Sequence, residues 1–315
     1  MNTQTTNPAA LPRRIITHAG SAHADEVVSI ALLLAADETV TSISRVPDVT
    51  PAELDDASVY VLDTGCCHDP GRLNFDHHQF DPEDTPRCTL SLVLEHLGLE
   101  SVARRCWPWL EAFERLDAGG PRAVEKLFGI HDLALILPQF RSPLEEVLVD
   151  IFSMKNAIRP DDMLWRFLWS IGQHLLAELR QLPDLIDGYE KQVISGVRIP
   201  PDVKVEVGKP FIAPPEWIDD IILLKWPDAP RSLARKAFQV FLREKAPEAR
   251  LTITPDERGP GFVLTSVSDS DPIDFRFLVD DPEIAFIHAT GFMAVTRSQD
   301  VTELDRLSRR MKEKP

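Results

Sequence analysis

The segment RIITHAGSAHADEVVSIALLLAA, residues 14–36, decides the fold. Its first part, Arg14–Thr17, predicts a short strand, and Ala24–Ala36 predicts a helix that follows after a brief loop. Further along, Ser58–Leu62 is a continuous apolar run, which is typical of a strand buried in a parallel sheet. Strand and helix therefore alternate in the first half of the chain, and this order favours an α/β fold built on a parallel sheet.

The remainder of the first half and the middle of the chain extend this pattern. A short strand is expected at Leu73–Phe75, with helices at Thr89–His96 and Trp107–Leu116. The middle is predicted to be helical over Pro143–Ser153 and Asp161–Leu182, because apolar residues recur there at intervals of three or four.

A break at Ile199-Pro200-Pro201 separates the helical middle from the last third, where a smaller α+β domain is expected. The elements predicted there are strands at Val203–Val207, Asp220–Lys225, Phe262–Val267 and Ile284–His288 and a helix at Ser232–Glu244. The predicted organisation is a disordered tail over residues 1–12, an α/β domain with a helical linker over 13–195, and the α+β domain over 200–315.

Composition and charge limit the classes of protein. The 315 residues are 43% hydrophobic and 27% charged, as in globular proteins with a buried core, and the net charge of -16 argues against general binding to nucleic acid or anionic membranes. No run approaches the ~20 apolar residues that cross a bilayer, and the N-terminus lacks the apolar centre of a signal peptide. The four cysteines form neither a CxxC zinc pattern nor a disulfide framework, so a cytoplasmic location is expected.

Histidines are concentrated near the N-terminus. Between positions 18 and 78, where an even spread of the nine would place about two, there are five: His18, His23, His68, His77 and His78. The first predicted strand ends at His18, the next at Asp63, and a third at the triplet Asp76-His77-His78. Because the carboxyl ends of parallel strands meet at one edge of a sheet, these groups are expected to converge there. His23 and Asp25 would reach the same edge from the loop after the first strand.

The converging groups have the chemistry of a metal site. Mixed imidazole and carboxylate ligands suit a divalent ion such as manganese, zinc or iron(II), and the lack of cysteine in the pattern argues against a structural zinc site. Six or more ligands exceed what one tetrahedral ion uses, so two ions sharing a bridging carboxylate are expected. Two ions ~3.5–4 Å apart clamp the attacking and leaving oxygens of a phosphoryl displacement and generate hydroxide at neutral pH.

Each residue taken alone also has a simpler interpretation. Asp25 is suited to cap the helix that follows it, His18 to be a hydrogen-bonded residue at a strand end, and Asp76 to be a turn residue. His68 and Asp69 precede a proline-glycine turn and are expected to be loop residues. The recurrence of the same chemistry at three strand ends is what favours a metal site.

The motifs of this region resemble those of a known family. They are H-x-G-x-x-H-x-D-E at residues 18–26, V-L-D-T-G at 61–65 and F-D-H-H-Q at 75–79. In this order they resemble the DHH phosphoesterase superfamily, and are most similar to its melanocyte-proliferating-gene branch, also called metal-dependent protein hydrolases. The resemblance extends to L-D-A-G at 116–119 and F-I-H-A-T-G-F at 286–292. It implies a DHH-type metal-binding catalytic domain followed by a substrate-binding domain that closes over the active site.

The resemblance implies a division of the metal ligands between two ions. One ion would be held by His18, His23 and Asp63, and the other by Asp25, Asp63, His77 and Asp117, with Asp63 bridging. Asp76 would orient an imidazole through the free ring N–H, and His78 would meet the substrate as a phosphate contact or proton donor.

Substrate contacts are expected from the last third of the chain. The resemblance implies that His288 and Gly291 bind substrate. The helix predicted at Ser232–Glu244, together with the residue before it, also carries four basic side chains: Arg231, Arg235, Lys236 and Arg243. Arg235 is the candidate phosphate contact of this set, although a solvated helix face is the alternative for all four.

The expected protein is a cytoplasmic hydrolase with two divalent ions, in the first place Mn²⁺, and without a membrane partner. It would hydrolyse a phosphodiester or phosphomonoester of a nucleotide or short oligonucleotide by a metal-bound hydroxide. Members of the branch resemble 3′-5′ exonucleases of RNA, and a homo-oligomer is compatible with the sequence. One alternative is an inorganic pyrophosphatase on the same scaffold, which the lack of a dense Arg/Lys cluster in the C-terminal half disfavours. Another is a metal- or nucleotide-binding regulatory protein with little turnover, which the intact ligand set disfavours.

Overall fold

A computed structural model describes residues 11–131, 143–189, 193–195, 220–223, 225–268 and 272–312. The chain divides into two compact units, Met1–Arg180 and Gln181–Pro315. Three predictions lie outside the described residues: residues 1–10 of the tail, the break at Ile199–Pro201 and the strand at Val203–Val207. Within the described part, no helix combines the length and the apolarity that a bilayer crossing requires.

The first unit is built on a six-stranded, mostly parallel sheet with the order β4-β5-β3-β1-β2-β6. Its strands are β1 (Arg13–His18), β2 (Val40–Val46), β3 (Val59–Leu62), β4 (His68–Asp69), β5 (Asn74–Phe75) and β6 (Ala157–Ile158). The four central strands are parallel, and the short edge strands β4 and β6 are antiparallel to their neighbours. The α/β class with a parallel sheet, expected from the sequence, is thus present. β2 is a strand that the sequence analysis did not predict.

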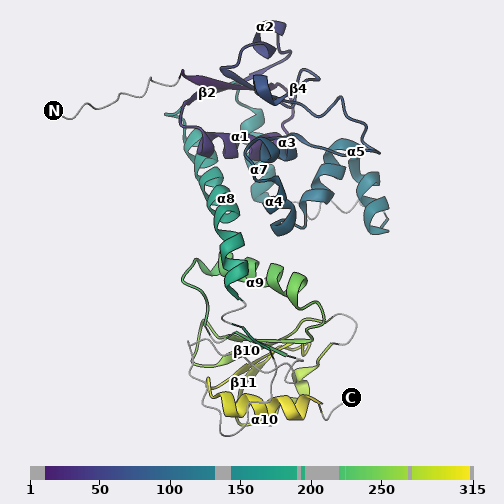
Figure 1. Cartoon of the computed structure of the whole chain (residues 1–315), viewed down its shortest axis with the longest axis vertical. Helices are drawn as coiled ribbons and strands as arrows, with labels where there is room; N and C mark the ends of the chain where they lie inside the picture. The colour runs from purple at the N-terminus through teal and green to yellow at the C-terminus, as the bar shows by residue number, and fades with distance from the viewer. Residues whose placement is uncertain are drawn as a thin grey trace, which may run out of the picture. The chain divides into compact units, whose positions relative to one another are not determined.

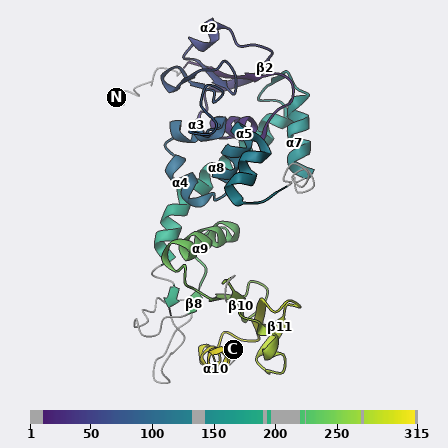
Figure 2. The ribbon, with the colours of Figure 1, turned by 90° about the vertical axis from the view of Figure 1, so that its right-hand side faces the viewer.

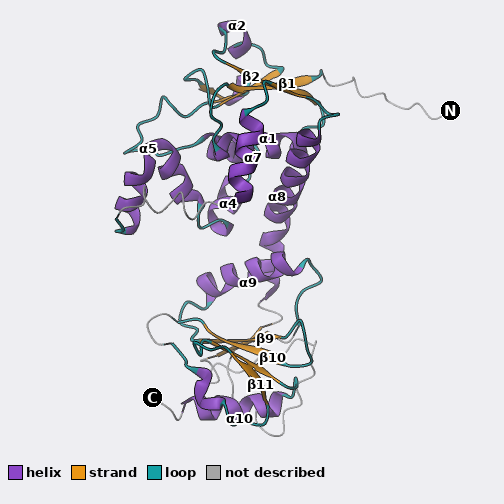
Figure 3. Cartoon of the chain, turned by 180° about the vertical axis from the view of Figure 1, so that it is seen from behind, coloured by secondary structure: helices purple, strands orange, loops and turns teal. Residues whose placement is uncertain are grey.

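Helices cover mainly one face of this sheet. They are α1 (Ala24–Ala36), α2 (Pro51–Leu54), α3 (Thr89–His96), α4 (Glu100–Cys106), α5 (Leu110–Phe128), α7 (Pro143–Ser153) and α8 (Met163–Gly188). Figures 1 and 3 show α1, α7 and α8 below the sheet and the short α2 above it. α1, α3 and α7 have the predicted bounds, whereas α5 begins three residues later than expected, because the backbone at Trp107 is not helical.

α1 is the central helix of the first unit. Its apolar residues from Ile30 to Leu34 are all buried, so the helix is enclosed on several sides. α8 packs closely against it: a Cβ added at Gly172 would lie 1.8 Å from the carbonyl oxygen of Ala31. Only glycine permits this approach, which brings the two helix backbones together.

The second unit contains another six-stranded sheet, with the order β11-β12-β10-β9-β8-β7. Its strands are β7 (Val193–Ser195), β8 (Asp220–Leu223), β9 (Leu251–Pro255), β10 (Phe262–Ser266), β11 (Ile284–Ile287) and β12 (Met293–Thr296). All neighbouring pairs are antiparallel except β8 and β9, which are parallel. The α+β character predicted for this part is therefore present.

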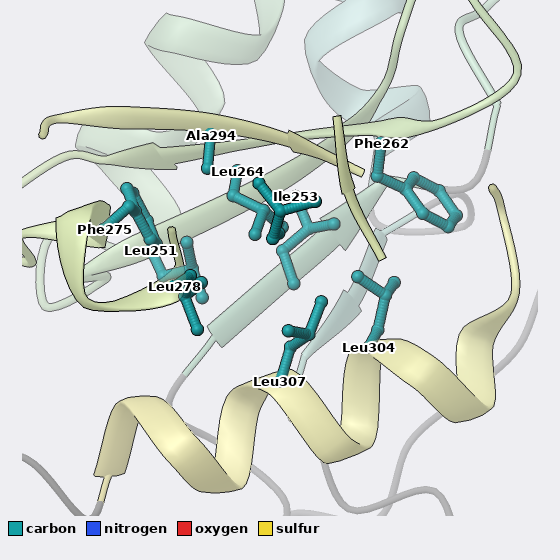
Figure 4. Packing of buried hydrophobic residues seen from close by; sticks show 10 residues of the cluster. Leu251, Ile253, Phe262, Leu264, Phe275, Leu278, Ala294, Leu304 and Leu307 are labelled. Carbon is teal, nitrogen blue, oxygen red and sulfur yellow. The ribbon is translucent and has the colours of Figure 1, made fainter. Parts of the chain in front are cut away.

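Two helices cover the second sheet, one on each face. Figure 2 shows α9 (Arg231–Lys245) on one side of it and α10 (Val301–Lys312) on the other. Leu304 and Leu307 of α10 point toward the sheet and join a buried cluster with Leu251, Ile253 and Leu264 (Figure 4). Burial of this apolar surface is the main force that holds α10 to the sheet.

Candidate metal centre

Three neighbouring parallel strands end at one edge of the first sheet. β1 ends at His18, Asp63 follows β3, and the triplet Asp76-His77-His78 follows β5. β3 pairs with both β1 and β5, so these three carboxyl ends lie side by side. The loop after β1 leads to His23, which occupies the N-cap of α1 and places Asp25 in the first helical turn.

Asp63 lies at the middle of the cluster. Its side chain is 1% exposed. Its Oδ2 is 3.3 Å from His18 Nε2 and 3.8 Å from His23 Nδ1, and its Oδ1 is 3.1 Å from His77 Nε2. The backbone of Asp63 has φ +53, in the left-handed region that a non-glycine residue seldom adopts. The two carboxylate oxygens therefore face different imidazoles, as in a carboxylate shared by two ions.

The buried oxygens of the cluster fit a cation. Among the residues that the structure describes, neither oxygen of Asp63 has a hydrogen-bond partner, and the same is true of Oδ1 of Asp25 and Oδ2 of Asp117. A buried polar atom without a partner costs free energy, and four carboxylate oxygens in one place cannot satisfy one another. Divalent cations bind carboxylate and imidazole donors, so the residues present fit a metal site.

Three overlapping groups of described residues have ligand atoms within 4.8 Å of one another: His18, His23 and Asp63; His23, Asp25 and Asp117; and Asp63, Asp76, His77 and His78. The first group has the same members as one predicted ligand set. The second predicted set is divided between the other two groups, with His77 Nε2 lying 3.0 Å from Asp117 Oδ2. Asp117 itself comes from α5, just before the helix breaks at Gly120.

Charges within the cluster shift the pKa values of its side chains. Burial, together with repulsion from neighbouring carboxylates, raises the pKa of Asp25 and of Asp117. The contact with Asp63 raises the pKa of His18 to about 9. For His77, burial acts in the opposite direction, but Asp63 and Asp117 raise its pKa to about 9. A bound divalent cation would relieve the repulsion between carboxylates and displace the protons of the imidazoles.

His18 has the orientation that ligation requires. Its Nδ1 is 2.8 Å from the carbonyl oxygen of Ala19, an acceptor, so the Nδ1–H donates this bond. Nε2, which faces Asp63, is then the nitrogen that can offer a lone pair.

Asp76 and His78 form a hydrogen-bonded pair within the third group, and His78 Nδ1 also lies 3.8 Å from Asp63 Oδ1. Asp76 is fully buried, and its Oδ2 accepts a hydrogen bond from the backbone N–H of Cys66 at 2.6 Å. Its Oδ1 accepts from Nδ1 of His78, also at 2.6 Å. The His78 side chain is 53% exposed. Asp76 therefore orients an imidazole that is about half exposed.

Hydrogen bonds in the structure test the simpler interpretations of Asp25, His68 and Asp69. Asp25 does not cap α1: its Oδ2 accepts from the backbone N–H of Thr89, at the start of α3. Asp69 behaves as a turn residue, since its Oδ1 accepts from the N–H of Gly71. Neither His68 nor Asp69 belongs to a potential metal group of the described chain.

The substrate contacts expected from the last third lie in the second unit. His288 precedes a tight turn in which the N–H of Gly291 donates to the carbonyl of His288. Gly291 has φ +78, and a Cβ there would lie 2.0 Å from Asp274 Oδ1, so glycine is required. Arg235 is exposed on α9, where its Nη2 lies 2.8 Å from Glu257 Oε1.

The sequence patterns assign no role to Glu26 and do not mark Arg45. Glu26 is fully buried, and its Oε1 is 3.4 Å from His18 Nε2. The spacing of Glu26, three residues after the N-cap His23, is a capping signal that sequence reasoning could have used. Arg45 lies in the unpredicted strand β2, and no local pattern marks it.

Comparison with known proteins adds a match over this region. Residues 14–106 match MYG1_exonuc, described as an uncharacterised protein family (UPF0160). The matched segment runs from β1 to the end of α4 and contains His18, His23, Asp25, Asp63, Asp76, His77 and His78, but not Asp117. It covers less than half of the chain, and over that segment it supports the branch that the motifs indicated. The wider DHH superfamily stays a prediction.

Other comparisons are weaker. No curated protein matches the chain. Among solved structures, it is similar to a pGpG-specific phosphodiesterase, PggH, from Vibrio cholerae, at 14% sequence identity and a TM-score of 0.28, over 96% of this chain and 98% of that chain. A superposition at this level carries no argument about fold or chemistry.

Proposed function

We propose that the protein is a phosphoesterase that uses two divalent cations, in the first place Mn²⁺, to hydrolyse a phosphodiester or phosphomonoester of a nucleotide or short oligonucleotide. The observation that carries the proposal is Asp63. Its two buried oxygens lack hydrogen-bond partners and face different imidazoles, which supports a carboxylate bridging two ions. His18 and His23 would complete one site, and Asp25, His77 and Asp117 the other.

When bound, two such ions would polarise the phosphoryl group and lower the pKa of water. Residues of the chain would contact the substrate and donate the proton. His78, held by Asp76 through Nδ1, would contact the phosphate or protonate the leaving oxygen with Nε2. Asp76 would keep that imidazole in one tautomer and one orientation.

The substrate class rests on two observations. The name of the matching family, MYG1_exonuc, suggests exonuclease activity. The net charge of -16 disfavours tight binding to long nucleic acids through charge alone, so a short substrate is favoured. His288, Gly291 and Arg235 stay proposed substrate contacts.

Turnover by the full-length protein tests the proposal. We expect Mn²⁺-dependent hydrolysis of bis-p-nitrophenyl phosphate and of a short RNA, abolished by EDTA. Hydrolysis of pyrophosphate alone would favour the pyrophosphatase alternative. Two bound ions without turnover on any of the three substrates would favour a binding protein.

Counting ions tests the bridging role. Because each ion would lose a charged oxygen ligand, Asp63→Ala should retain neither Mn²⁺ after dialysis against limiting metal, by elemental analysis. Asp69→Ala, which removes a nearby turn carboxylate outside the metal groups, should retain both ions and full activity. Equal retention of two ions by wild type and Asp63→Ala would exclude the bridge.

A further inference from the structure

Glu26 contacts both ends of the loop that carries two proposed metal ligands. Its Oε1 accepts a hydrogen bond from the backbone N–H of His23 at 3.1 Å and lies 3.4 Å from Nε2 of His18. Its Oε2 accepts from the hydroxyl of Thr17. Glu26 itself belongs to none of the potential metal groups in the described chain. Its carboxylate therefore holds the backbone of His23 and lies beside the same nitrogen of His18 that faces Asp63.

The buried side chain of Arg45 links Glu26 to a distant helix. Its Nη2 lies 3.7 Å from Glu26 Oε1, and its Nη1 donates to the carbonyl oxygen of Ser153 at 2.9 Å. The guanidinium lies over the ring of Phe152, 5.0 Å from the centroid. Arg45 thus places a positive charge between a buried carboxylate and the last residues of α7, where helix carbonyls concentrate negative charge.

Ser153 anchors the same loop from a second direction. Its Oγ accepts from the backbone N–H of Ala22 at 2.9 Å and donates to the carbonyl of Val149 at 2.8 Å. The loop also contains Gly20 at φ +92, a position where the backbone has unusual freedom. The end of α7 and Glu26 together fix a loop that would otherwise have many conformations.

We propose that Glu26 and Arg45 are positioning residues of the metal centre, which hold in place the loop that carries His18 and His23, with the end of α7 as the anchor. The inference rests on the proposed metal centre and extends it to a buried ion pair. Ordering two imidazoles before the metal arrives removes an entropic cost from binding. Groups that orient metal ligands in this way typically contribute about 10- to 100-fold in metal affinity.

The test is Mn²⁺ titration of the metal-free, full-length protein by calorimetry. Glu26→Gln should bind the same number of ions with about 10- to 100-fold lower affinity. Arg45→Met should lose a similar factor, and the double variant little more than the larger single loss, because both residues act through one pair. Ser153→Ala, which removes the bond from Ala22 and the bond to the carbonyl of Val149, is the mild variant and should weaken binding several-fold even if Arg45→Met does not fold.

Asp37→Asn is the matched control. Asp37 lies at the other end of α1 and pairs with Arg13 at 2.6 Å, so its loss removes a carboxylate–arginine pair far from the ligands. It should keep wild-type Mn²⁺ affinity within about twofold, as expected for a site with no shared partners.

Four results would overturn the inference. Wild-type affinity in both Glu26→Gln and Ser153→Ala would show that the contacts do not matter. Loss of a whole ion in Glu26→Gln would make Glu26 a ligand. Equal weakening by Asp37→Asn would reduce the effect to general stability. A wild-type protein that binds no Mn²⁺ would overturn the proposed function and this inference together, whereas the first three results leave the proposed function intact.

Discussion

At the residue scale, the candidate centre contains two histidines that are adjacent in sequence but have different neighbours in space. His77 is 6% exposed and faces Asp63 and Asp117, whereas His78 is 53% exposed and faces Asp76. Two consecutive imidazoles thus have different surroundings. We therefore propose the first as a metal ligand and the second as a substrate contact.

Substitution of each imidazole separates the two roles. His78→Ala should keep both ions and lose ~10²-fold or more in turnover, the usual scale for a lost acid-base group. His77→Ala should lose metal and activity together. Elemental analysis combined with a rate measurement on each variant decides the matter; if His78→Ala is the variant that loses an ion, the two roles are exchanged.

Asp37 gives the first unit a pH dependence that is independent of metal. Partial burial acts against the shift, but hydrogen bonds from Thr39 and Arg13 lower the pKa of Asp37 to about 2, from an ordinary 3.8. A lowered native pKa means that the ionised form stabilises the fold above pH 3.8 and that this stabilisation is lost as the pH falls toward 2. The free energy of unfolding of the wild type, measured in urea, should therefore decline more steeply in this window than that of Asp37→Asn. Parallel declines in the two proteins would exclude this role for Asp37.

At the scale of elements, the ligands are positioned by how helices pack under the sheet. α1 carries Asp25 in its first turn, and α8 lies against α1 where Gly172 meets the carbonyl of Ala31. α7 meets the loop before α1 through Ser153. α1 and the loop before it are therefore held by elements more than 100 residues away in the sequence.

Gly172→Ala tests the closeness of this packing. The added Cβ would overlap a backbone oxygen, and relief requires the helices to separate, at a cost of about 1–3 kcal/mol in the free energy of unfolding. Gly188→Ala is the control on the same helix, because a Cβ there meets nothing within 4 Å. It should be neutral or slightly stabilising. Denaturant unfolding that gives equal stabilities for the two variants would show that α8 is free to move away from α1.

At the scale of the whole molecule, the chain consists of two compact units with different sheets, and all the proposed metal ligands belong to the first. A bound ion stabilises the part of the protein that holds it by mass action. Binding of Mn²⁺ should therefore protect amides of the first unit from hydrogen exchange more than amides of the second.

Hydrogen exchange of the full-length protein with and without Mn²⁺ measures this difference in protection. Amides of β1, of the loop up to α1 and of residues 61–80 should become better protected on addition of metal. Amides of residues 225–268 and 272–312 should change little. Equal protection of both units would contradict the assignment of all ligands to the first.

The sequence by itself determined the elements whose signals are local. α1, α3 and α7 appear with the predicted bounds, because apolar periodicity and end signals lie within each segment. The convergence of His18, Asp63 and the triplet at 76–78 could also be predicted, since parallel strands place their carboxyl ends at one edge. Asp117 was reached only through the family resemblance, because nothing in its helix marks it as a ligand.

The tertiary structure alone decided what depends on distant partners. β2, VTSISRV, lacks an apolar run, and the buried charge of Arg45 within it faces Glu26 and the end of α7, where its Nη1 donates to the carbonyl of Ser153. Likewise, Glu26 looks like an ordinary helix-capping residue until the fold places it against His18. Burial of a charge requires a partner nearby in space, and a linear pattern does not specify which distant residue that partner is.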